Sequence, residues 1–279
     1  MTLSPRQVRD LLDQHGLAPS RALGQNFVAD PNTVRRIARL AGVGPGDRVV
    51  EIGPGLGSLT LALAETGASV TAVEVDRHLL PALHQVVDPA GVRVVHGDAL
   101  RLDWDAVLGP PGDGPPWALV ANLPYNVATP LVLDLLAGVP AIDRMLVMVQ
   151  REVGERLAAR PGEKAYGIPS VKVAYRAEAE IVGRVPPTVF IPPPRVDSAL
   201  VSIRRLPAPP VDADPATLFR LVEAGFGQRR KMLRRSLTGL VPAEAFAAAG
   251  VRPEARAEEL DLAAWSRLAD EVWKGERHE

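Results

Sequence analysis

The stretch VANLPYNVATP (Val120–Pro130) places an amide and an aromatic ring on either side of a proline, directly after an apolar run. Asn122 offers a side-chain carbonyl as hydrogen-bond acceptor, and the Leu123 backbone carbonyl, directed outward by Pro124, offers a second. Tyr125 offers a face for base stacking, a contact worth roughly 1 to 3 kcal/mol. Such a group could hold the poorly nucleophilic amine of adenine during alkylation. The alternative is a strand-to-helix turn with a packed tyrosine.

A glycine-rich turn follows an earlier apolar run in VVEIGPGLGSLT, with Gly53, Gly55 and Gly57 before a helical pattern. Glycines suit a backbone that must turn tightly and approach a ligand closely. On its own, the turn fits a nicotinamide dinucleotide, S-adenosylmethionine or no ligand. Ser58 stands where a dinucleotide fingerprint has its third glycine, which disfavours a bound pyrophosphate.

Polar residues also end the next three strand-like runs: Glu74, Asp98 and Asn122. Each could be an ordinary strand-end residue when taken alone. The carboxyl ends of parallel strands share one edge of a sheet, however, and ligands bind at that edge. A ribose acceptor at Glu74, a partner for an adenine amine and the glycine turn together predict an adenosine-containing cofactor.

Short apolar runs alternate with helical patterns through the first half of the chain, which predicts a mostly parallel sheet with helices on both faces. The expected strands are 48–53, 69–76, 92–98, 117–125 and 144–150, and the expected helices are 31–41, 59–66, 79–87, 129–136 and one from residue 152. In the first of these helices Asp30 is the expected cap, Pro31 fits the first position and Gly42 the end.

The second half has a different pattern. Residues 169–206 predict two long strands joined by a proline-rich connection, forming a hairpin at one sheet edge. The stiff segment PAPPVDADP follows, and the remainder, including residues 219–237, is predicted to be helical. We therefore expect two domains, residues 1–207 and 208–279. The segment Gly109–Pro116 is expected to be a surface loop.

Composition excludes several classes of protein. The chain has no cysteine, which removes disulfide frameworks, thiol nucleophiles and cysteine-ligated zinc. No apolar run approaches the roughly 20 residues of a membrane span, so we expect a cytoplasmic protein without a membrane partner. The net charge is only −1, yet residues 204–240 hold eight basic and three acidic residues, which is consistent with a local anionic partner.

The motifs LGQNFV, VVEIGPGLGSLT, AVEVD, GDAL, NLPYNVATP, MVQREVGERLAARPGEKAYG, VFIPPPRVDSALV and FGQRRKMLRRSL occur in this order from about Leu23 to Leu237. Together they resemble the ribosomal RNA adenine dimethyltransferase family. The resemblance implies a Rossmann-like class I S-adenosylmethionine-dependent methyltransferase fold with a small all-helical C-terminal domain. It also implies S-adenosylmethionine as cofactor, no metal, and transfer of methyl groups to the exocyclic amines of adenines in ribosomal RNA.

The resemblance assigns roles to individual residues. The cofactor is expected to contact Asn26, Val28, Gly53, Gly55, Glu74, Asp98 and Asn122. Gln25 and Phe27 belong to the same N-terminal lid as Asn26 and Val28. The Asn122–Leu123–Pro124 segment holds the target amine, while Tyr125 and Phe190 sandwich the adenine. RNA phosphates are expected on Arg229, Arg230, Lys231, Arg234 and Arg235, for which a solvated helical face is the alternative. Val28, Met232 and Arg235 depart from the family's usual residues.

Three functions remain open at this point. The first is dimethylation of two adjacent adenines in small-subunit ribosomal RNA, linked to small-subunit biogenesis, with a monomer acting on the precursor particle (pre-30S). The second is a large-subunit ribosomal RNA adenine methyltransferase of the antibiotic-resistance type. The third is a non-catalytic ribosome-assembly factor. The motifs FGQRRKMLRRSL and PPPRVDS favour the first.

Overall fold

The computed structural model describes residues 2–20, 22–110 and 112–276. Its contacts divide the chain into two compact units, Met1–Gly154 with Glu180–Arg205, and Glu155–Ala179 with Leu206–Glu279. The second unit thus includes a segment from the middle of the chain, whereas the sequence suggested one cut between residues 207 and 208. That cut remains a prediction about independent domains. No helix in the described ranges is long and apolar enough to cross a membrane.

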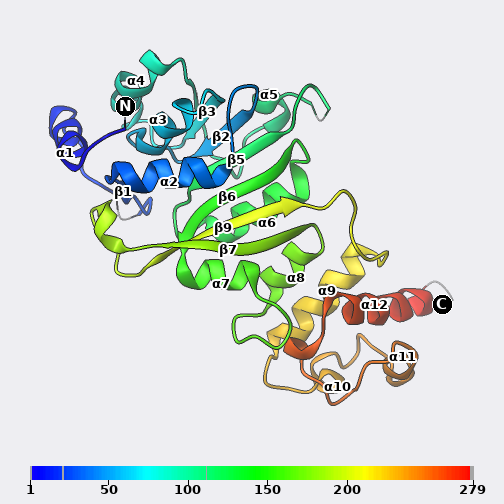
Figure 1. The fold of residues 1–279 in the computed structure, drawn as a ribbon. Helices are drawn as coiled ribbons and strands as arrows, with labels where there is room; N and C mark the ends of the chain where they lie inside the picture. The colour runs from blue at the N-terminus through cyan, green and yellow to red at the C-terminus, as the bar shows by residue number, and fades with distance from the viewer. Residues whose placement is uncertain (1, 21, 111, 277–279) are drawn as a thin grey trace. The chain divides into compact units, whose positions relative to one another are not determined.

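A seven-stranded sheet forms the centre of the first unit, in the order β4-β3-β2-β5-β6-β9-β7 (Figure 1). Strands β4, β3, β2, β5 and β6 are mutually parallel, whereas β9 runs antiparallel to β6. The strands are β2 (Arg48–Ile52), β3 (Ser69–Glu74), β4 (Arg93–His96), β5 (Trp117–Asn122), β6 (Ile142–Gln150), β7 (Ala177–Val185) and β9 (Ser198–Arg205). The predicted parallel sheet and the hairpin at its edge are confirmed.

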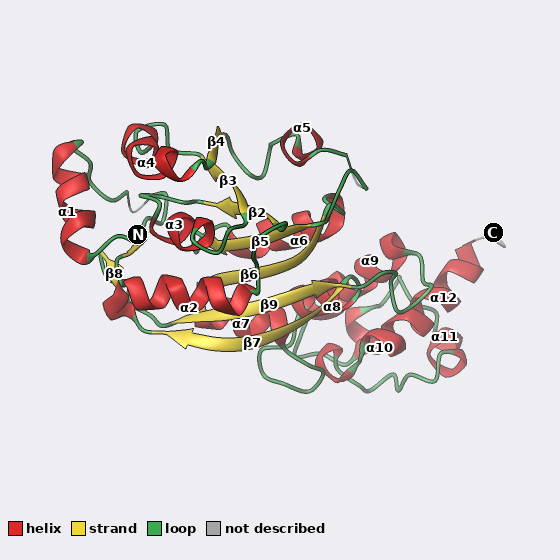
Figure 2. Ribbon diagram, turned by 45° about the horizontal axis from the view of Figure 1, so that its top comes forward, coloured by secondary structure: helices red, strands yellow, loops and turns green. Residues whose placement is uncertain are grey.

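Helices lie on both faces of this sheet (Figure 2). The helices of the first unit are α1 (Pro5–Gln14), α2 (Pro31–Ala41), α3 (Ser58–Ala64), α4 (Leu80–Val87), α5 (Trp104–Leu108), α6 (Ala128–Gly138) and α7 (Arg151–Ala158), the last of which continues into the second unit. On one face, apolar residues of α2, α3 and α4 pack with buried residues of six strands of the sheet in a single core. This packing stabilises the parallel sheet because both of its faces need apolar cover.

Local sequence explains how α2 begins and ends. The Asp30 carboxylate accepts hydrogen bonds from the backbone N–H and the hydroxyl of Thr33, Pro31 fills the first turn, and Gly42 ends the helix in the left-handed conformation. The buried residues Val34, Ile37 and Ala38 recur at helical spacing. The predicted cap, first position and end are all confirmed.

A short second sheet brings the N-terminal segment to the sequence motif near residue 190. Strands β1 (Phe27–Val28) and β8 (Phe190–Ile191) pair antiparallel, with Phe27 opposite Ile191 and Val28 opposite Phe190. Phe27 also joins the core formed with α1. The pairing fixes the path of the backbone just after Gln25 and Asn26, because the β1 residues follow directly.

The second unit is helical, with α8 (Ile168–Ala174), α9 (Pro215–Gly227), α10 (Leu233–Ser236), α11 (Ala243–Ala248) and α12 (Leu262–Glu276). Trp265, fully buried, lies in its apolar core with Tyr166 and Phe246. The predicted strand at 169–174 is wrong. Val171 and Tyr175, four residues apart, both face this core, so the segment is a helix despite its strand-like alternation.

Residues 219–237, predicted to be helical, are helical only in part. Helix α9 ends at Gly227, a turn spans Gln228–Met232, and α10 is only four residues long. Glycine is a poor helix former, and Gly227 provides no side-chain contact that would carry α9 onward. In the expected surface loop Gly109–Pro116, Pro111 lies outside the described residues, while Gly112–Pro116 is exposed.

Candidate functional site

A cavity of about 250 Å³ lies at the carboxyl ends of β2, β3, β4 and β5. The residues predicted to end these strands all line it, and so does the N-terminal segment Leu23–Val28. This volume is slightly below the roughly 300–1,000 Å³ common for small-molecule sites. Convergence of polar strand ends on one cavity is the arrangement expected at the ligand-binding edge of a parallel sheet.

The glycine turn beside the cavity has a backbone conformation and a packing that disfavour larger residues. Gly53, Gly55 and Gly57 all have positive φ, at 71°, 58° and 87°. A Cβ on Gly55 would lie 2.8 Å from a ring carbon of Phe27, and one on Gly57 would lie 2.7 Å from a methyl carbon of Val87. Backbone conformation and close packing therefore both require glycine at Gly55 and Gly57, whereas at Gly53 the backbone conformation alone favours it.

The Glu74 carboxylate ties the glycine turn to the loop after β3. Its Oε2 accepts a hydrogen bond from Gly55 N at 3.1 Å, and its Oε1 accepts one from Asp76 N at 2.9 Å. A carboxylate has about four acceptor positions, so each oxygen can still accept a hydrogen bond from a ligand hydroxyl. Burial raises the pKa of Glu74, and the backbone hydrogen bonds to Asp76 and Gly55 offset part of that rise.

Glu51 is a cavity residue that the sequence reasoning missed. It lies in β2 and lines the cavity with only 1% of its surface exposed, and its Oε2 has no hydrogen-bond partner within the described ranges. Burial raises its pKa to about 8, and the nearby negative charge of Glu74 acts in the same direction. An acidic residue inside the otherwise apolar run VVEI was the signal that could have identified it.

The N-terminal segment orients Asn122. The side-chain Nδ2 of Asn122 donates to the Asn26 backbone oxygen at 3.1 Å. Asn26 in turn donates through its own Nδ2 to Gly24 O, and Gln25 donates to Asp76 Oδ2 at 2.8 Å. Because its nitrogen is already bonded, the Asn122 side chain keeps its carbonyl oxygen as the acceptor for a ligand.

Tyr125 is held by a residue that the sequence reasoning did not single out. Its hydroxyl lies 2.9 Å from the Oγ of Ser198, a fully buried residue at the start of β9. Burial raises the pKa of Tyr125, and the Ser198 hydrogen bond lowers it in part. Tyr125, Pro124 and Leu123 all line the cavity, and the Leu123 backbone is fixed by its N–H bond to Met148 O. The ring is therefore held at the cavity wall.

Asp98 and Val28 also line the cavity, as expected. Asp98 Oδ1 accepts from Leu100 N at 3.0 Å, and Oδ2 lies 3.6 Å from Arg101 Nε in an exposed ion pair. The half-exposed Asp98 carboxylate thus retains acceptor positions for a base amine. Among the described residues, no group of three or more side chains could hold a metal ion.

Phe190 is not among the residues that line the cavity. It is 3% exposed and packs in the sheet core, in register with Val28. Phe190 therefore lies beside Val28, which lines the cavity, but its own ring does not face the cavity. Its stacking role remains a prediction that requires the ring to be uncovered.

The five predicted RNA-binding cations lie in two short segments rather than along one helix. Arg229, Arg230 and Lys231 are exposed in the turn after α9, and Arg234 and Arg235 are exposed on α10. Arg234 lies 3.8 Å from Glu254, and Arg229 is bonded to Glu258 and to Lys164 O. The end of α9 thus separates these cations into two groups.

The sheet order, the antiparallel β9 and the glycine turn, with acidic residues at the ends of neighbouring strands, define a class I S-adenosylmethionine-dependent methyltransferase. The family model for ribosomal RNA adenine dimethylase matches residues 18–274. The chain belongs to this ribosomal RNA adenine dimethylase family.

Curated relatives match nearly the whole chain. Ribosomal RNA small subunit methyltransferase A of Kineococcus radiotolerans is 52% identical over 277 residues, covering 96% of this chain and 90% of that protein. The protein of the same name in Thermobifida fusca is 50% identical over 279 residues, covering 96% and 95%.

Two solved structures are also similar. The 23S rRNA methyltransferase ErmE has a TM-score of 0.67 at 28% identity, covering 88% of this chain and 99% of that chain. A dimethyladenosine transferase from Plasmodium falciparum shares the fold, with a TM-score of 0.74 at 22% identity, covering 89% and 98%.

Proposed function

We propose that this protein dimethylates the exocyclic amines of two adjacent adenines in small-subunit ribosomal RNA, and that it does so during small-subunit biogenesis. The observation that carries the proposal is the orientation of Asn122. Its amide nitrogen is bonded to the N-terminal segment, and its carbonyl oxygen remains for a substrate amine at the edge of a cavity suited to S-adenosylmethionine. About 50% identity to proteins named small subunit methyltransferase A supports this choice of substrate.

The residues present fit the cofactor. The unpartnered, buried Oε2 of Glu51 suits an ammonium group, because a buried acceptor without a partner is unfavourable. Glu74 retains acceptor positions for ribose hydroxyls, Asp98 for the adenine amine, and Gly53 and Gly55 allow close backbone approach. When bound, S-adenosylmethionine supplies an electrophilic sulfonium methyl group.

Positioning of the substrate amine accounts for the rest of the chemistry. Asn122 Oδ1 and the Leu123 backbone carbonyl accept hydrogen bonds from the amine, while the Tyr125 ring supports the base. These acceptors hold the nitrogen lone pair toward the methyl group and stabilise the positive charge that develops as the nitrogen–carbon bond forms. The sulfur–methyl bond would break at the same time, and its electron pair would stay on the sulfur of a neutral thioether leaving group. The alkylated nitrogen then releases one proton. A second transfer to the same nitrogen gives dimethyladenosine.

Two other functions are less well supported. A large-subunit methyltransferase of the resistance type shares this fold, but the 23S rRNA methyltransferase ErmE is only 28% identical, against 52% for a small-subunit relative. A purely non-catalytic assembly factor would not need an oriented Asn122 beside a cofactor-sized cavity. We further propose that the partner is the precursor small subunit and that the protein acts as a monomer in the cytoplasm.

Substitution of Asn122 tests the role of the amide. Asn122→Ala removes both the donor to Asn26 O and the acceptor for the amine, and we expect methyl transfer to slow about 100-fold or more. Asn122→Asp keeps an acceptor and should retain more activity. The affinity for S-adenosylmethionine, measured by calorimetry, reports separately on the cofactor site. Full activity of Asn122→Ala on small ribosomal subunits would contradict the proposed mechanism.

A further inference from the structure

Arg229 is engaged on both sides of its guanidinium in the second unit. Its Nε lies 3.1 Å from Glu258 Oε2, and its Nη2 donates to the Lys164 backbone oxygen at 2.9 Å. An arginine bonded to both a carboxylate and a carbonyl has a fixed geometry, because its donors form a rigid planar fork. Arg229 therefore links the turn after α9 to the loop around Lys164.

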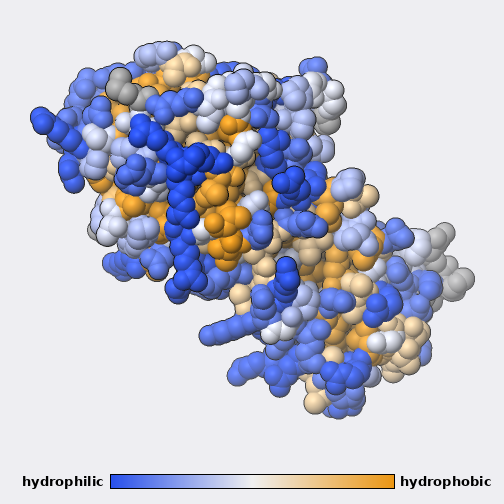
Figure 3. Space-filling view, in the orientation of Figure 1, coloured by the Kyte–Doolittle hydropathy of each residue, from blue (hydrophilic) through white to orange (hydrophobic). Residues whose placement is uncertain are grey.

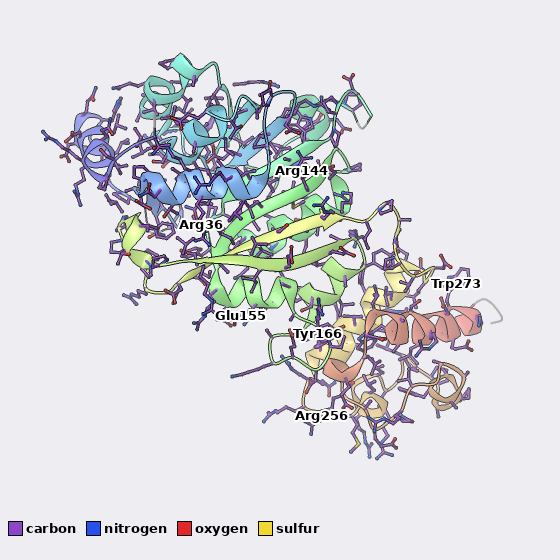
Figure 4. The ribbon with its side chains drawn as sticks, viewed as in Figure 1. Arg36, Arg144, Glu155, Tyr166, Arg256 and Trp273 are labelled. Carbon is purple, nitrogen blue, oxygen red and sulfur yellow. The ribbon has the colours of Figure 1, made fainter. Side chains whose placement is uncertain are left out.

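The loop Arg160–Tyr166 is held at further points by the short helix η3 (Ala257–Glu259) and the residue after it. Gly162 N donates to Glu258 O at 2.8 Å, and the Tyr166 hydroxyl donates to Leu260 O at 2.9 Å. Tyr166 is labelled in Figure 4. It is buried, with 2% of its surface exposed. Glu258 thus holds the loop directly through its backbone and indirectly through Arg229.

The anchored loop and the turn present four exposed cations that have no acidic partner within the described ranges: Arg160, Lys164, Arg230 and Lys231. Hydrophilic side chains gather on the surface over α10 and the neighbouring turn (Figure 3). By contrast, Arg234 has an acidic neighbour in Glu254. Exposed cations without acidic partners, on a loop and a turn whose backbone is anchored, suit phosphates, because binding requires neither the breaking of ion pairs nor the ordering of a loose loop.

We propose that the loop Arg160–Tyr166 and the turn Gln228–Met232 form one surface for RNA phosphates, with Arg229 as its positioning residue rather than a phosphate contact. The inference rests on the proposed function, because it takes ribosomal RNA as the ligand. It adds Arg160 and Lys164 to the contact residues. It also assigns a structural task to an acidic residue, Glu258, beside a surface that binds an anion.

Glu258→Gln distinguishes two roles of Arg229, as a simple cation or as a positioning residue, because the two roles predict opposite changes in RNA affinity. If Arg229 were only a cation, removing the neighbouring negative charge would strengthen RNA binding. If Glu258 positions Arg229 and the loop, the same change weakens binding, by about tenfold. Arg229→Lys keeps the charge but loses the planar fork, so it should weaken binding to a similar extent. The double variant should be no weaker than either single variant, since both break one unit.

The assay is binding of each variant to purified small ribosomal subunits with unmethylated adenines, over a range of salt concentrations. Lys164→Gln is the matched control, expected to reduce the slope of log K against log salt by about 0.7 to 0.9 for one lost phosphate contact. Limited trypsin cleavage after Lys164, without RNA, reports on loop anchoring. Cleavage should be faster in Arg229→Lys and Glu258→Gln than in wild type.

Tighter or unchanged binding by Glu258→Gln, or wild-type binding by Arg229→Lys, would overturn the positioning role. Unchanged trypsin cleavage in both variants would overturn the anchoring on which that role depends. A wild-type protein that neither binds nor methylates small subunits would instead overturn the proposed function. The cleavage measurement without RNA keeps these two failures distinguishable.

Discussion

The buried carboxyl of Glu51 predicts a specific pH dependence of stability. Burial raises its pKa from 4.5 to about 8 in the folded protein, whereas the unfolded chain ionises near the ordinary value. Between these values the folded state binds one more proton than the unfolded state, so stability falls as pH rises. The stabilising contribution of the proton is complete below pH 4.5 and is lost as pH rises through about 8.

Glu51→Gln removes this titration while keeping the shape of the side chain. With the pKa values above, the free energy of unfolding of wild type should fall, relative to the variant, by roughly 2 to 3 kcal/mol between pH 5 and pH 7. Urea unfolding at half-unit pH intervals measures both proteins. Glu74, whose pKa burial also raises, interacts with Glu51, so a Glu74→Gln variant and the double variant are measured in parallel to separate the two titrations.

Cofactor binding gives a second measurement on the same residue. A carboxylate that binds an ammonium group must first lose its proton, so wild-type affinity for S-adenosylmethionine should rise about tenfold per pH unit below the pKa of Glu51. Glu51→Gln should bind more weakly and lose that dependence. The reasoning would be refuted if the free energy of unfolding of wild type and of Glu51→Gln changed in parallel with pH and if their affinities for S-adenosylmethionine had the same pH dependence.

Two further changes test the cavity wall. Gly55→Ala puts a Cβ 2.8 Å from the Phe27 ring, so calorimetry should show that the affinity for the cofactor falls at least tenfold. Gly42→Ala is the control, because Gly42 has a similar φ but open space around it. This control should lower only the free energy of unfolding, by about 1 kcal/mol. Unchanged cofactor binding by Gly55→Ala would rule out the close approach. Ser198→Ala should raise KM for RNA about fivefold in the wild-type background, because it removes a hydrogen bond of about 1 kcal/mol to Tyr125. In a Tyr125→Phe background this bond is already absent, so Ser198→Ala should have no further effect on KM. Additive effects of the two substitutions would contradict this coupling.

The sequence predicted the part of the site that depends on strand ends. Gly53, Glu74, Asp98 and Asn122 could be placed at one edge because parallel strands of similar length end together. Glu51 and Ser198 were not predicted from the sequence, for a different reason. Their importance comes from burial and from partners far along the chain, such as Tyr125, and neither property has a local periodicity.

The errors in secondary structure have physical causes. Residues 169–174 alternate like a strand, but packing of Val171 and Tyr175 on the helical core selects a helix. Local pattern cannot decide such a segment when tertiary contacts favour the other state. The end of α9 at Gly227 was visible as a glycine, yet the basic residues that follow have high helix propensity and suggested continuation.

Transfer of labelled methyl groups from S-adenosylmethionine to purified, unmodified ribosomal subunits tests the central claim most directly. Small subunits, large subunits and protein-free RNA are assayed in parallel, and each modified base is mapped. We expect dimethyladenosine at two adjacent adenines of the small-subunit RNA, with no labelling of large subunits. Labelling confined to large-subunit RNA, or binding to small subunits without any methyl transfer, would contradict it.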